Sequence, residues 1–152
     1  MKTFYQLIIE AEEIDFPLDR KINYKGIPIE VENSVGSMRK GKDKNGETWS
    51  TKMIHNYGRI KNTIDNTGDM LDVYLNSNKQ ERDISNKVYI VNQINPETKS
   101  FDEVKVMIGF LNIKDAQKAY LIHYNSSKYF GNIHEISLSK FKEALMNNIK
   151  NQ

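Results

Sequence analysis

The stretch that decides the fold is NYGRIKNTIDNTGDMLDV, residues 56–73. Two short apolar runs, Tyr57 to Ile60 and Leu71 to Leu75, flank a polar segment rich in Asn, Thr and Asp. Short runs with branched and aromatic residues around such a segment predict two strands joined by a turn. The polar segment is therefore the first place to look for chemistry.

The end of this stretch places two carboxylates, Asp69 and Asp72, three residues apart after Gly68. If the first ends a turn and the second begins a strand, both can point into one cavity. Paired acids suit hard divalent cations such as magnesium, which prefers oxygen ligands. One acid can instead take a proton from a metal-bound water. A Gly-Asp pair before a strand is also common in ordinary turns, so this spacing alone does not distinguish a site from a turn.

Outward from this stretch, the chain reads as strands followed by helices. Asn33 to Gly46 is expected to be a long loop or loose hairpin, and Asn76 to Asn86 an exposed loop. Trp49 is expected in the core, and residues 14–25 form an irregular arm. Further strands are expected over residues 3–10, 27–32, 48–54, 87–94 and 101–110, the last two as a hairpin.

Two helices are expected near the end of the chain. Asn112 caps the first, from Ile113 to about Tyr124, and would place His123 at its surface. Ser137 caps the second, which carries a core-packing apolar stripe. This order predicts one α+β domain over residues 1–152, with a barrel or curled sheet and the two helices packed at one side. The stripe consists of Leu138, Phe141, Leu145 and Ile149.

Composition excludes several classes of protein. The chain contains no cysteine, so disulfides and thiolate metal sites are impossible, and a reducing cytoplasmic setting is expected. No apolar run approaches the length of a membrane span, and Met1 to Phe4 lack a signal-peptide pattern. The formal net charge of only +2 argues against nucleic acid as a partner. The basic run from Arg39 to Lys44 is either a phosphate-binding patch or a solvated turn.

The stretch 56–73 resembles the signature of the soluble, magnesium-dependent inorganic pyrophosphatases: Asn-Tyr-Gly-x-Ile, then Asn-Thr, then Asp-Gly-Asp-x-x-Asp-Val. The resemblance extends over roughly Gly26 to Leu145 and leaves residues 1–25 outside as a strand or arm. The wider chain is similar to a phage and mobile-element branch of that family. The resemblance implies a small, closed or partly open antiparallel β-barrel, like that of pyrophosphatases and OB folds, with two C-terminal helices. It also allows a homo-oligomer.

The resemblance further implies a site in which magnesium, or manganese, bridges the substrate phosphates and acidifies a water. Asp69 would be the base that orients the attacking water, and Tyr57 would line the site. Lys105 would contact phosphate, Arg39 would clamp it, and Tyr124 with Lys128 would form a further phosphate-binding pair. The metal ligands implied are Asp72, Asp102 or the adjacent Glu103, and Glu32.

Two positions depart from the family pattern. Thr67 stands where the signature has its first acid, and Asn95 stands where the phage branch usually carries Asp. Each exchange removes a negative charge from a site meant to gather divalent cations. Asp65 or Glu97 could compensate.

Two interpretations stay open. The chain is a magnesium-dependent hydrolase of pyrophosphate or a larger phosphoanhydride, or it keeps the fold as a binding module that engages a host protein or a nucleotide. A third interpretation is binding of single-stranded nucleic acid along Arg39 to Lys44 with Tyr57 and Trp49. The nearly balanced net charge argues against it.

Overall fold

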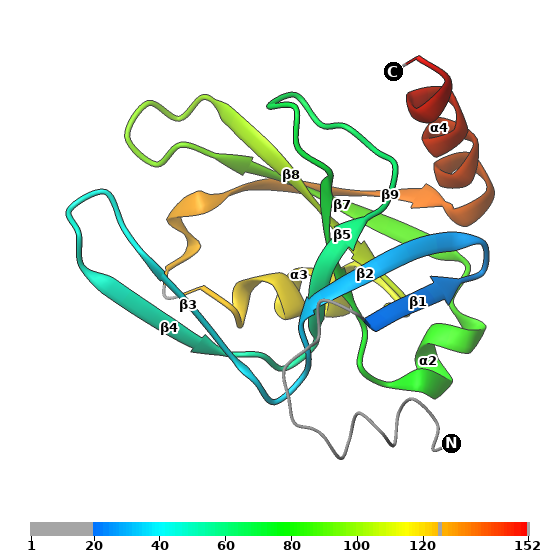
Figure 1. Ribbon diagram of the computed structural model, residues 1–152, viewed down its shortest axis with the longest axis horizontal. Helices are drawn as coiled ribbons and strands as arrows, with labels where there is room; N and C mark the ends of the chain where they lie inside the picture. The colour runs from blue at the N-terminus through cyan, green and yellow to red at the C-terminus, as the bar shows by residue number, and fades with distance from the viewer. Residues whose placement is uncertain (1–19, 125, 152) are drawn as a thin grey trace.

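The computed structural model describes residues 20–124 and 126–151. The strand expected over residues 3–10 lies outside the described residues. Within them the chain forms nine strands and three α-helices (Figure 1). The strands are β1 (Arg20–Tyr24), β2 (Ile27–Asn33), β3 (Met38–Lys42), β4 (Thr48–Lys52), β5 (Asn56–Ile60), β6 (Leu71–Leu75), β7 (Lys87–Ile94), β8 (Phe101–Ile108) and β9 (Phe130–Ser137); the helices are α2 (Lys79–Ile84), α3 (Ile113–Leu121) and α4 (Leu138–Lys150), with a short 3₁₀ turn, η2, over Ser127–Tyr129.

Seven strands form one sheet in the order β1-β2-β5-β6-β8-β7-β9, and β3 and β4 pair separately as a hairpin. The α+β class is confirmed. The barrel is not, because the sheet is open: β1 and β9 form its two edges with the other strands between them. The expectation of wholly antiparallel pairing is wrong, since β8 inserts between β6 and β7 and runs parallel to β6.

Alternating side chains supply a core on each face of the sheet. On β6, Val73 and Leu75 belong to one cluster and Tyr74 to the other. The same period of two recurs on β8, as expected for a strand buried on both faces. Helix α4 packs against the first core through Phe141 and Leu145, while α3 packs against the second.

The helices near the end of the chain differ in part from expectation. Both caps are correct: the side chain of Asn112 accepts from Asp115 N, and that of Ser137 accepts from Lys140 N. Helix α3 stops at Leu121, and His123 beyond it is buried rather than at the surface. Its ring accepts a hydrogen bond from Ile54 N at 3.0 Å, so it fastens the end of the β3–β4 hairpin to the body of the protein.

Three elements were missed, and two of them, α2 and β9, have sequences without an apolar period. Helix α2 has no buried residue, and it lies in the segment expected to be an exposed loop. Strand β9 pairs with β7 at the edge of the sheet. In the chain it lies between α3 and α4, where no strand was expected. Strand β1 likewise falls in the segment expected to be an irregular arm, and pairs with β2.

The hairpin β3–β4 projects from the sheet as an arm (Figure 1). Its residues alternate between exposed and half-buried along both strands. Trp49 is half-buried on this arm and belongs to neither core cluster, so its expected place in the core is wrong. The segment over residues 33–46, expected to be a long loop or a loose hairpin, supplies the first strand and the turn of this hairpin. No helix in the described part of the chain is long and apolar enough to cross a membrane.

Candidate functional site

A row of alternating charge crosses four strands at the edge of the second core. Glu30 on β2 lies opposite Arg59 on β5, Arg59 opposite Asp72 on β6, and Asp72 opposite Lys105 on β8. Residues directly opposite one another share a face of the sheet, so all four side chains point the same way. Arg59 binds Glu30 at 3.2 Å and Glu32 at 3.1 Å. Tyr74 and Met107, two residues further along β6 and β8, are on the same face and belong to the core.

Lys105 is the buried centre of this row. Its Nζ donates to Asp72 Oδ2 at 2.7 Å and to the Tyr57 hydroxyl at 3.0 Å, and lies 3.5 Å from Glu103. Burial acts to lower the pKa of Lys105, but Tyr57, Tyr124, Asp72 and Glu103 outweigh it and raise that pKa above its ordinary value. The ammonium therefore stays charged.

The neighbouring groups on either side of Lys105 are held in place by further contacts. Burial raises the pKa of Tyr57 to about 12, so its hydroxyl is neutral at physiological pH. Burial also raises the pKa of Glu103. Gln93 donates to Glu103 at 3.4 Å and accepts from the Tyr120 hydroxyl at 2.7 Å. The orientation of Glu103 is thus set by a chain that begins on α3.

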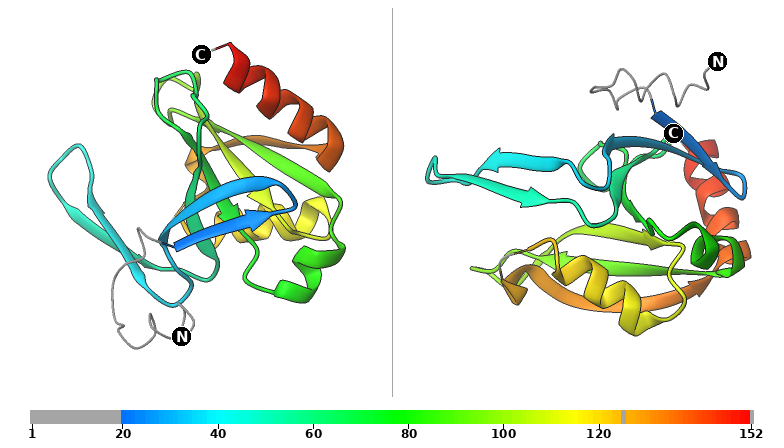
Figure 2. Two further views of the ribbon diagram at one scale, coloured as in Figure 1. Left: turned by 45° about the vertical axis from the view of Figure 1, so that its right-hand side comes forward. Right: turned by 90° about the horizontal axis from the view of Figure 1, so that it is seen from below.

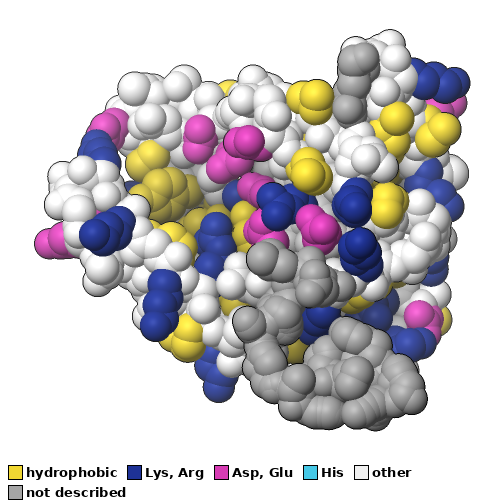
Figure 3. All heavy atoms as spheres, viewed as in Figure 1, with side chains coloured by type: hydrophobic (Ala, Val, Ile, Leu, Met, Phe, Trp, Pro, Cys, Tyr) yellow, Lys and Arg dark blue, Asp and Glu magenta, His cyan; other side chains and the backbone are white. Residues whose placement is uncertain are grey.

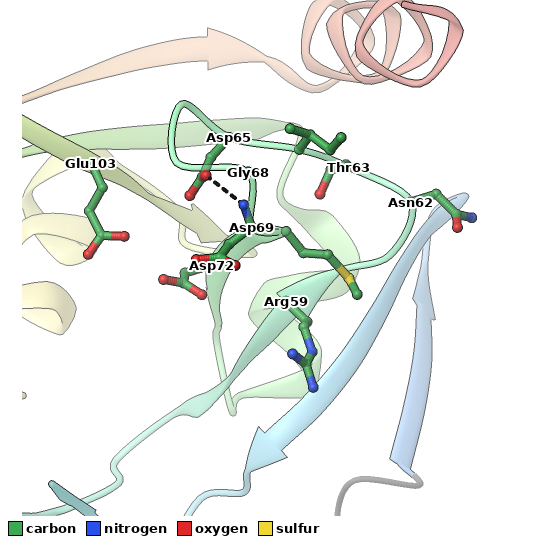
Figure 4. A pocket seen from close by; sticks show the side chains of 10 residues that line it. Arg59, Asn62, Thr63, Asp65, Gly68, Asp69, Asp72 and Glu103 are labelled. Atoms are coloured by element: carbon green, nitrogen blue, oxygen red, sulfur yellow. Dashed lines mark hydrogen bonds between the residues drawn. The ribbon is translucent and has the colours of Figure 1, made fainter. Parts of the chain in front are cut away.

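The turn between β5 and β6 is closed by Asp65. Its Oδ1 accepts from Thr67 N at 2.8 Å and from Thr67 Oγ1 at 2.7 Å. It also accepts from Asp69 N at 3.1 Å (Figure 4). Burial acts to raise the pKa of Asp65, but the hydrogen bonds from Thr67, Asp69 and Gly68 hold it below its ordinary value. Thr67, which replaces an acid of the signature, is therefore a donor within the turn.

Asp69 is placed differently from Asp65, although both line one cavity. Its side chain is exposed and accepts from Thr67 Oγ1 at 3.3 Å, which leaves most of its lone pairs available. The cavity has a volume of about 540 Å³. Figure 4 shows the carboxylates of Asp65, Asp69, Asp72 and Glu103 along it, with Arg59 below.

A second, larger cavity of about 810 Å³ lies between the β3–β4 arm and the β7–β8 hairpin, and Glu103 lines both cavities. Figure 2, in its right-hand view, shows the arm on one side and β7, β8 and β9 on the other. Figure 3 shows a hollow lined with hydrophobic side chains beside a group of acidic ones. Lys44 at the tip of the arm pairs with Glu97 at the tip of the other hairpin. Both residues line the cavity.

The structure brings most of the predicted site residues together. Lys105, Asp72, Tyr57 and Glu103 form one contacting group. The guanidinium of Arg39 lies 4.4 Å from the centre of the Tyr57 ring and so joins it from the arm. The second cavity is lined by Arg39, Lys105, Asp102, Glu103, Tyr124 and Lys128.

Other predicted residues are not brought into this group. Glu32 is held by Arg59 and lines neither cavity. Glu97, which could compensate for the acid missing at Asn95, is paired with Lys44 at the tips of the two hairpins. The Asn95 side chain accepts from Glu97 N and Thr98 N and closes its own turn.

Sequence reasoning missed the roles of Arg59 and Gln93, and it included Lys44 only as the end of the basic run from Arg39. The signal for Arg59 was present, because it occupies the variable position of Asn-Tyr-Gly-x-Ile while Glu30 and Glu32 alternate on a predicted strand. An arginine between two such acids predicts cross-strand pairing. No pattern in the sequence predicts the pairing of Lys44 with Glu97 or the contact of Gln93 with Glu103.

The donor set of the first cavity fits a hard divalent cation. Its carboxylates are oxygen donors of the kind that magnesium prefers, and they face one space. The described residues nevertheless contain no group of three or more His, Asp or Glu side chains placed to hold a metal ion together. Asp72 and Glu103 instead share one cation, Lys105, as their partner.

Comparison with known proteins finds similar chains among solved structures. Among solved structures, similar chains include an inorganic pyrophosphatase from Neisseria gonorrhoeae (17% identity, TM-score 0.45, covering 91% of this chain and 96% of that one). Another is an inorganic pyrophosphatase from Helicobacter pylori (16% identity, TM-score 0.44, covering 92% of this chain and 98% of that one). A third is an inorganic phosphatase from Anaplasma phagocytophilum (18% identity, TM-score 0.43, covering 81% of this chain and 90% of that one). Among curated proteins, nothing matches.

The family assignment rests on a family model described as Inorganic Pyrophosphatase, which matches residues 10–146. The match begins upstream of Gly26, where the resemblance in the sequence was expected to begin. It takes in the signature turn, both cavities and most of α4. By this match over nearly its whole length, the chain belongs to the inorganic pyrophosphatase family.

Proposed function

We propose that this protein hydrolyses pyrophosphate, or a related phosphoanhydride, in a magnesium-dependent reaction. Membership of the inorganic pyrophosphatase family supports pyrophosphate hydrolysis as the general activity. The observation that carries the proposal is the buried, charged Lys105, held between Asp72 and the Tyr57 hydroxyl where the two cavities meet. A cation fixed in this way is suited to bind an oxygen of a phosphoanhydride.

The phosphate side of the site consists of donors that neighbouring side chains already hold in place. Lys105 holds one phosphate oxygen, and the neutral Tyr57 hydroxyl can donate to another. Arg39, stacked on the Tyr57 ring, presents its planar fork to a second phosphate group. Lys128 and Tyr124 line the same cavity and extend the contact. Together these groups fix the substrate and stabilise the charge that develops as the anhydride opens.

The water side of the site is the carboxylate-lined cavity. Asp69 is the base in this proposal, because its carboxylate is exposed and has lone pairs to accept a proton at Oδ1 or Oδ2. Asp65 is unsuited to that role, since its Oδ1 already accepts three hydrogen bonds. Asp72 with Asp102 or Glu103 would hold magnesium, or manganese. The bound ion would supply neutralisation of the phosphate oxygens and acidification of a water.

The experiment that tests the proposal is phosphate release from pyrophosphate with magnesium or manganese. Asp69→Asn is the informative variant, and Asp83→Asn on α2 is its matched control, because Asp83 is exposed and lines neither cavity. We expect release that is lost by roughly 100-fold or more in Asp69→Asn and kept in Asp83→Asn. No release from the folded protein with either metal would refute the proposal.

A specific observation favours a second candidate function. The described residues hold no three-residue acidic or histidine metal cluster, and Thr67 and Asn95 complete turns instead of supplying carboxylates. On this view the protein is a catalytically impaired member of the family, of phage or mobile-element origin, that engages a host protein or a nucleotide. Absence of phosphate release from folded protein is the result it predicts.

A further inference from the structure

We infer that the larger cavity takes the heterocyclic end of a nucleoside diphosphate, so that the preferred phosphoanhydride carries a planar base. This inference rests on the proposed function of the same site and names the class of its substrate. It begins from the β3–β4 arm, whose inner face is built from residues that serve no core.

The inner face of the arm is an aromatic and cationic wall. Of its half-buried residues, Arg39, Trp49 and Thr51 line the larger cavity. Trp49 lies across Gly41, its register partner, so closely that a Cβ at Gly41 would come within 2.4 Å of Trp49 Cζ2. The backbone of the neighbouring strand therefore supports the indole ring. A supported, half-exposed aromatic ring outside the core is a surface on which a base can stack.

The opposite wall of the cavity is also aromatic. Tyr124 and Tyr129 flank the segment after α3, with ring centres 6.1 Å apart, and both line the cavity. Lys128 lies between them in sequence, with its Nζ 5.5 Å from the Tyr129 ring centre. The pair of Lys44 and Glu97 spans the tips of the two hairpins beside this space. A base entering here meets rings on both sides and a cation beside each.

A chain of contacts connects the aromatic wall to the phosphate side. The guanidinium of Arg39 lies 5.3 Å from the Trp49 ring centre and 4.4 Å from that of Tyr57. The Tyr57 hydroxyl in turn accepts from Lys105. One ligand can therefore stack on Trp49 and place its diphosphate beside Lys105. Inorganic pyrophosphate uses only the second part of this chain and leaves the cavity of about 810 Å³ largely to water.

The reaction that follows is balanced without any other reactant. Water adds to the terminal phosphorus of the nucleoside diphosphate as the bond from that phosphorus to the bridging oxygen breaks. The products are the nucleoside monophosphate, inorganic phosphate and one proton. The base at Asp69 is the same as in the proposed hydrolysis of pyrophosphate.

Trp49 is the only tryptophan of the chain, which gives the test a direct signal. We would titrate the protein, with magnesium present, with ADP, pyrophosphate and adenosine while measuring tryptophan fluorescence. Stacking predicts strong quenching by ADP, weaker binding of adenosine, and little quenching by pyrophosphate. Failure of ADP to change the fluorescence or to bind in calorimetry would overturn the inference.

Variants separate a stacking role from a structural one. By calorimetry, we expect Trp49→Ala to lower the affinity for ADP relative to that for pyrophosphate by about tenfold, and Trp49→Phe to restore most of that ratio. Phe101→Ala, which removes an aromatic ring that is 52% exposed and lines neither cavity, should leave the ratio unchanged. An equal loss of both affinities in Trp49→Ala would overturn the inference.

The outcomes also distinguish this inference from the proposed function. Pyrophosphate hydrolysis without ADP binding would overturn the inference alone. ADP binding through Trp49 without phosphate release from either compound would support the base subsite and refute the hydrolase. Tighter binding of a thymidine oligonucleotide than of ADP, falling steeply with salt, would overturn the inference in favour of a single-strand groove.

Discussion

Lys105 Nζ lies 2.7 Å from Asp72 Oδ2, and only 5% of the lysine side chain is exposed against 27% of the aspartate side chain. The two residues are register partners on the parallel strands β8 and β6. A buried lysine is costly unless its charge is compensated, so removing either residue destabilises the protein through the charge left on the other. This makes the pair a test of both the fold and the site.

Replacing the lysine is the first prediction. Lys105→Met removes the cation between Asp72 and Glu103 and leaves two half-buried carboxylates without compensation. We expect the free energy of unfolding to fall by about 2–4 kcal/mol and phosphate release to fall by roughly 100-fold or more. Urea unfolding and steady-state phosphate release measure the two effects.

The matched control for this variant is Lys87→Met. Lys87 pairs with Glu135 at 2.6 Å, but its side chain is 43% exposed. Its loss should change the free energy of unfolding little, because solvent screens an exposed pair, and should leave hydrolysis unchanged. If Lys105→Met does not fold, Lys105→Arg keeps the charge and isolates the geometry. Full activity in a folded Lys105→Met protein would contradict the assigned role.

The second prediction restores an acid of the family signature. Thr67→Asp removes the hydroxyl that donates to Asp65 and Asp69 and adds a third carboxylate beside them. Without metal, repulsion should lower the melting temperature. With magnesium, the added ligand should lower the magnesium concentration that half-saturates the protein about tenfold. Thermal unfolding with and without magnesium measures both.

Ser50→Asp is the control for the added charge, because Ser50 is exposed and lines neither cavity. It should change neither the melting temperature nor the response to magnesium. An equal magnesium response in the wild type and Thr67→Asp would show that position 67 has no part in metal binding.

How far the sequence predicts this molecule depends on whether a contact is local. The β7–β8 hairpin follows from apolar alternation on either side of a turn, and α4 follows from its cap and stripe. Helix α2 and strand β9 carry neither pattern. Their positions are set by pairing and packing with distant segments, which no local period records.

The candidate site shows the same division. Asp69 and Asp72 are marked by the signature turn, and Lys105 by resemblance. Yet Asp72 and Lys105 meet only because β8 inserts between β6 and β7, and periodicity gives no strand order. The trapping of Asp65 inside its turn, and the pairing of Glu32 with Arg59, likewise depend on hydrogen bonds and register.

The third prediction concerns the glycine of the Asn-Tyr-Gly motif. A Cβ on Gly58 would lie 2.0 Å from the backbone oxygen of Glu30 on the neighbouring strand β2. Backbone atoms within a sheet cannot give way cheaply, so Gly58→Ala should force β2 and β5 apart. We expect a loss of about 3 kcal/mol or more in the free energy of unfolding, measured with urea.

Gly46→Ala is the matched control, since a Cβ there meets nothing within 4 Å. Gly46 has a φ of 81°, so its substitution should cost about 1–2 kcal/mol through backbone strain alone. Equal losses at the two positions would show that close approach of the strands does not explain the glycine at position 58.

The fourth prediction is a loss of stability in mild acid caused by His55. Burial, and secondarily the neighbouring His123, lower the pKa of His55 from 6.5 to about 4. Its Nδ1 accepts from Ser77 N at 3.0 Å, and its ring meets the edge of Phe110, so the folded protein holds the neutral form. Between pH 6.5 and 4 the unfolded chain therefore binds more protons than the folded one. The contribution of neutral His55 to the free energy of unfolding is fully present above pH 6.5. It decreases as the pH falls toward 4, by about 2 kcal/mol for a partly exposed ring.

Urea unfolding at a series of pH values measures this slope. His55→Asn should reduce it, because the asparagine oxygen can accept from Ser77 N without titrating. Part of the slope should remain, since burial also lowers the pKa of His123. His134→Asn, at an exposed position on β9, is the control and should keep the full slope. An unchanged slope in His55→Asn would mean that other groups cause the acid sensitivity. It would also mean that the folded protein accepts a protonated His55 between Ser77 and Phe110.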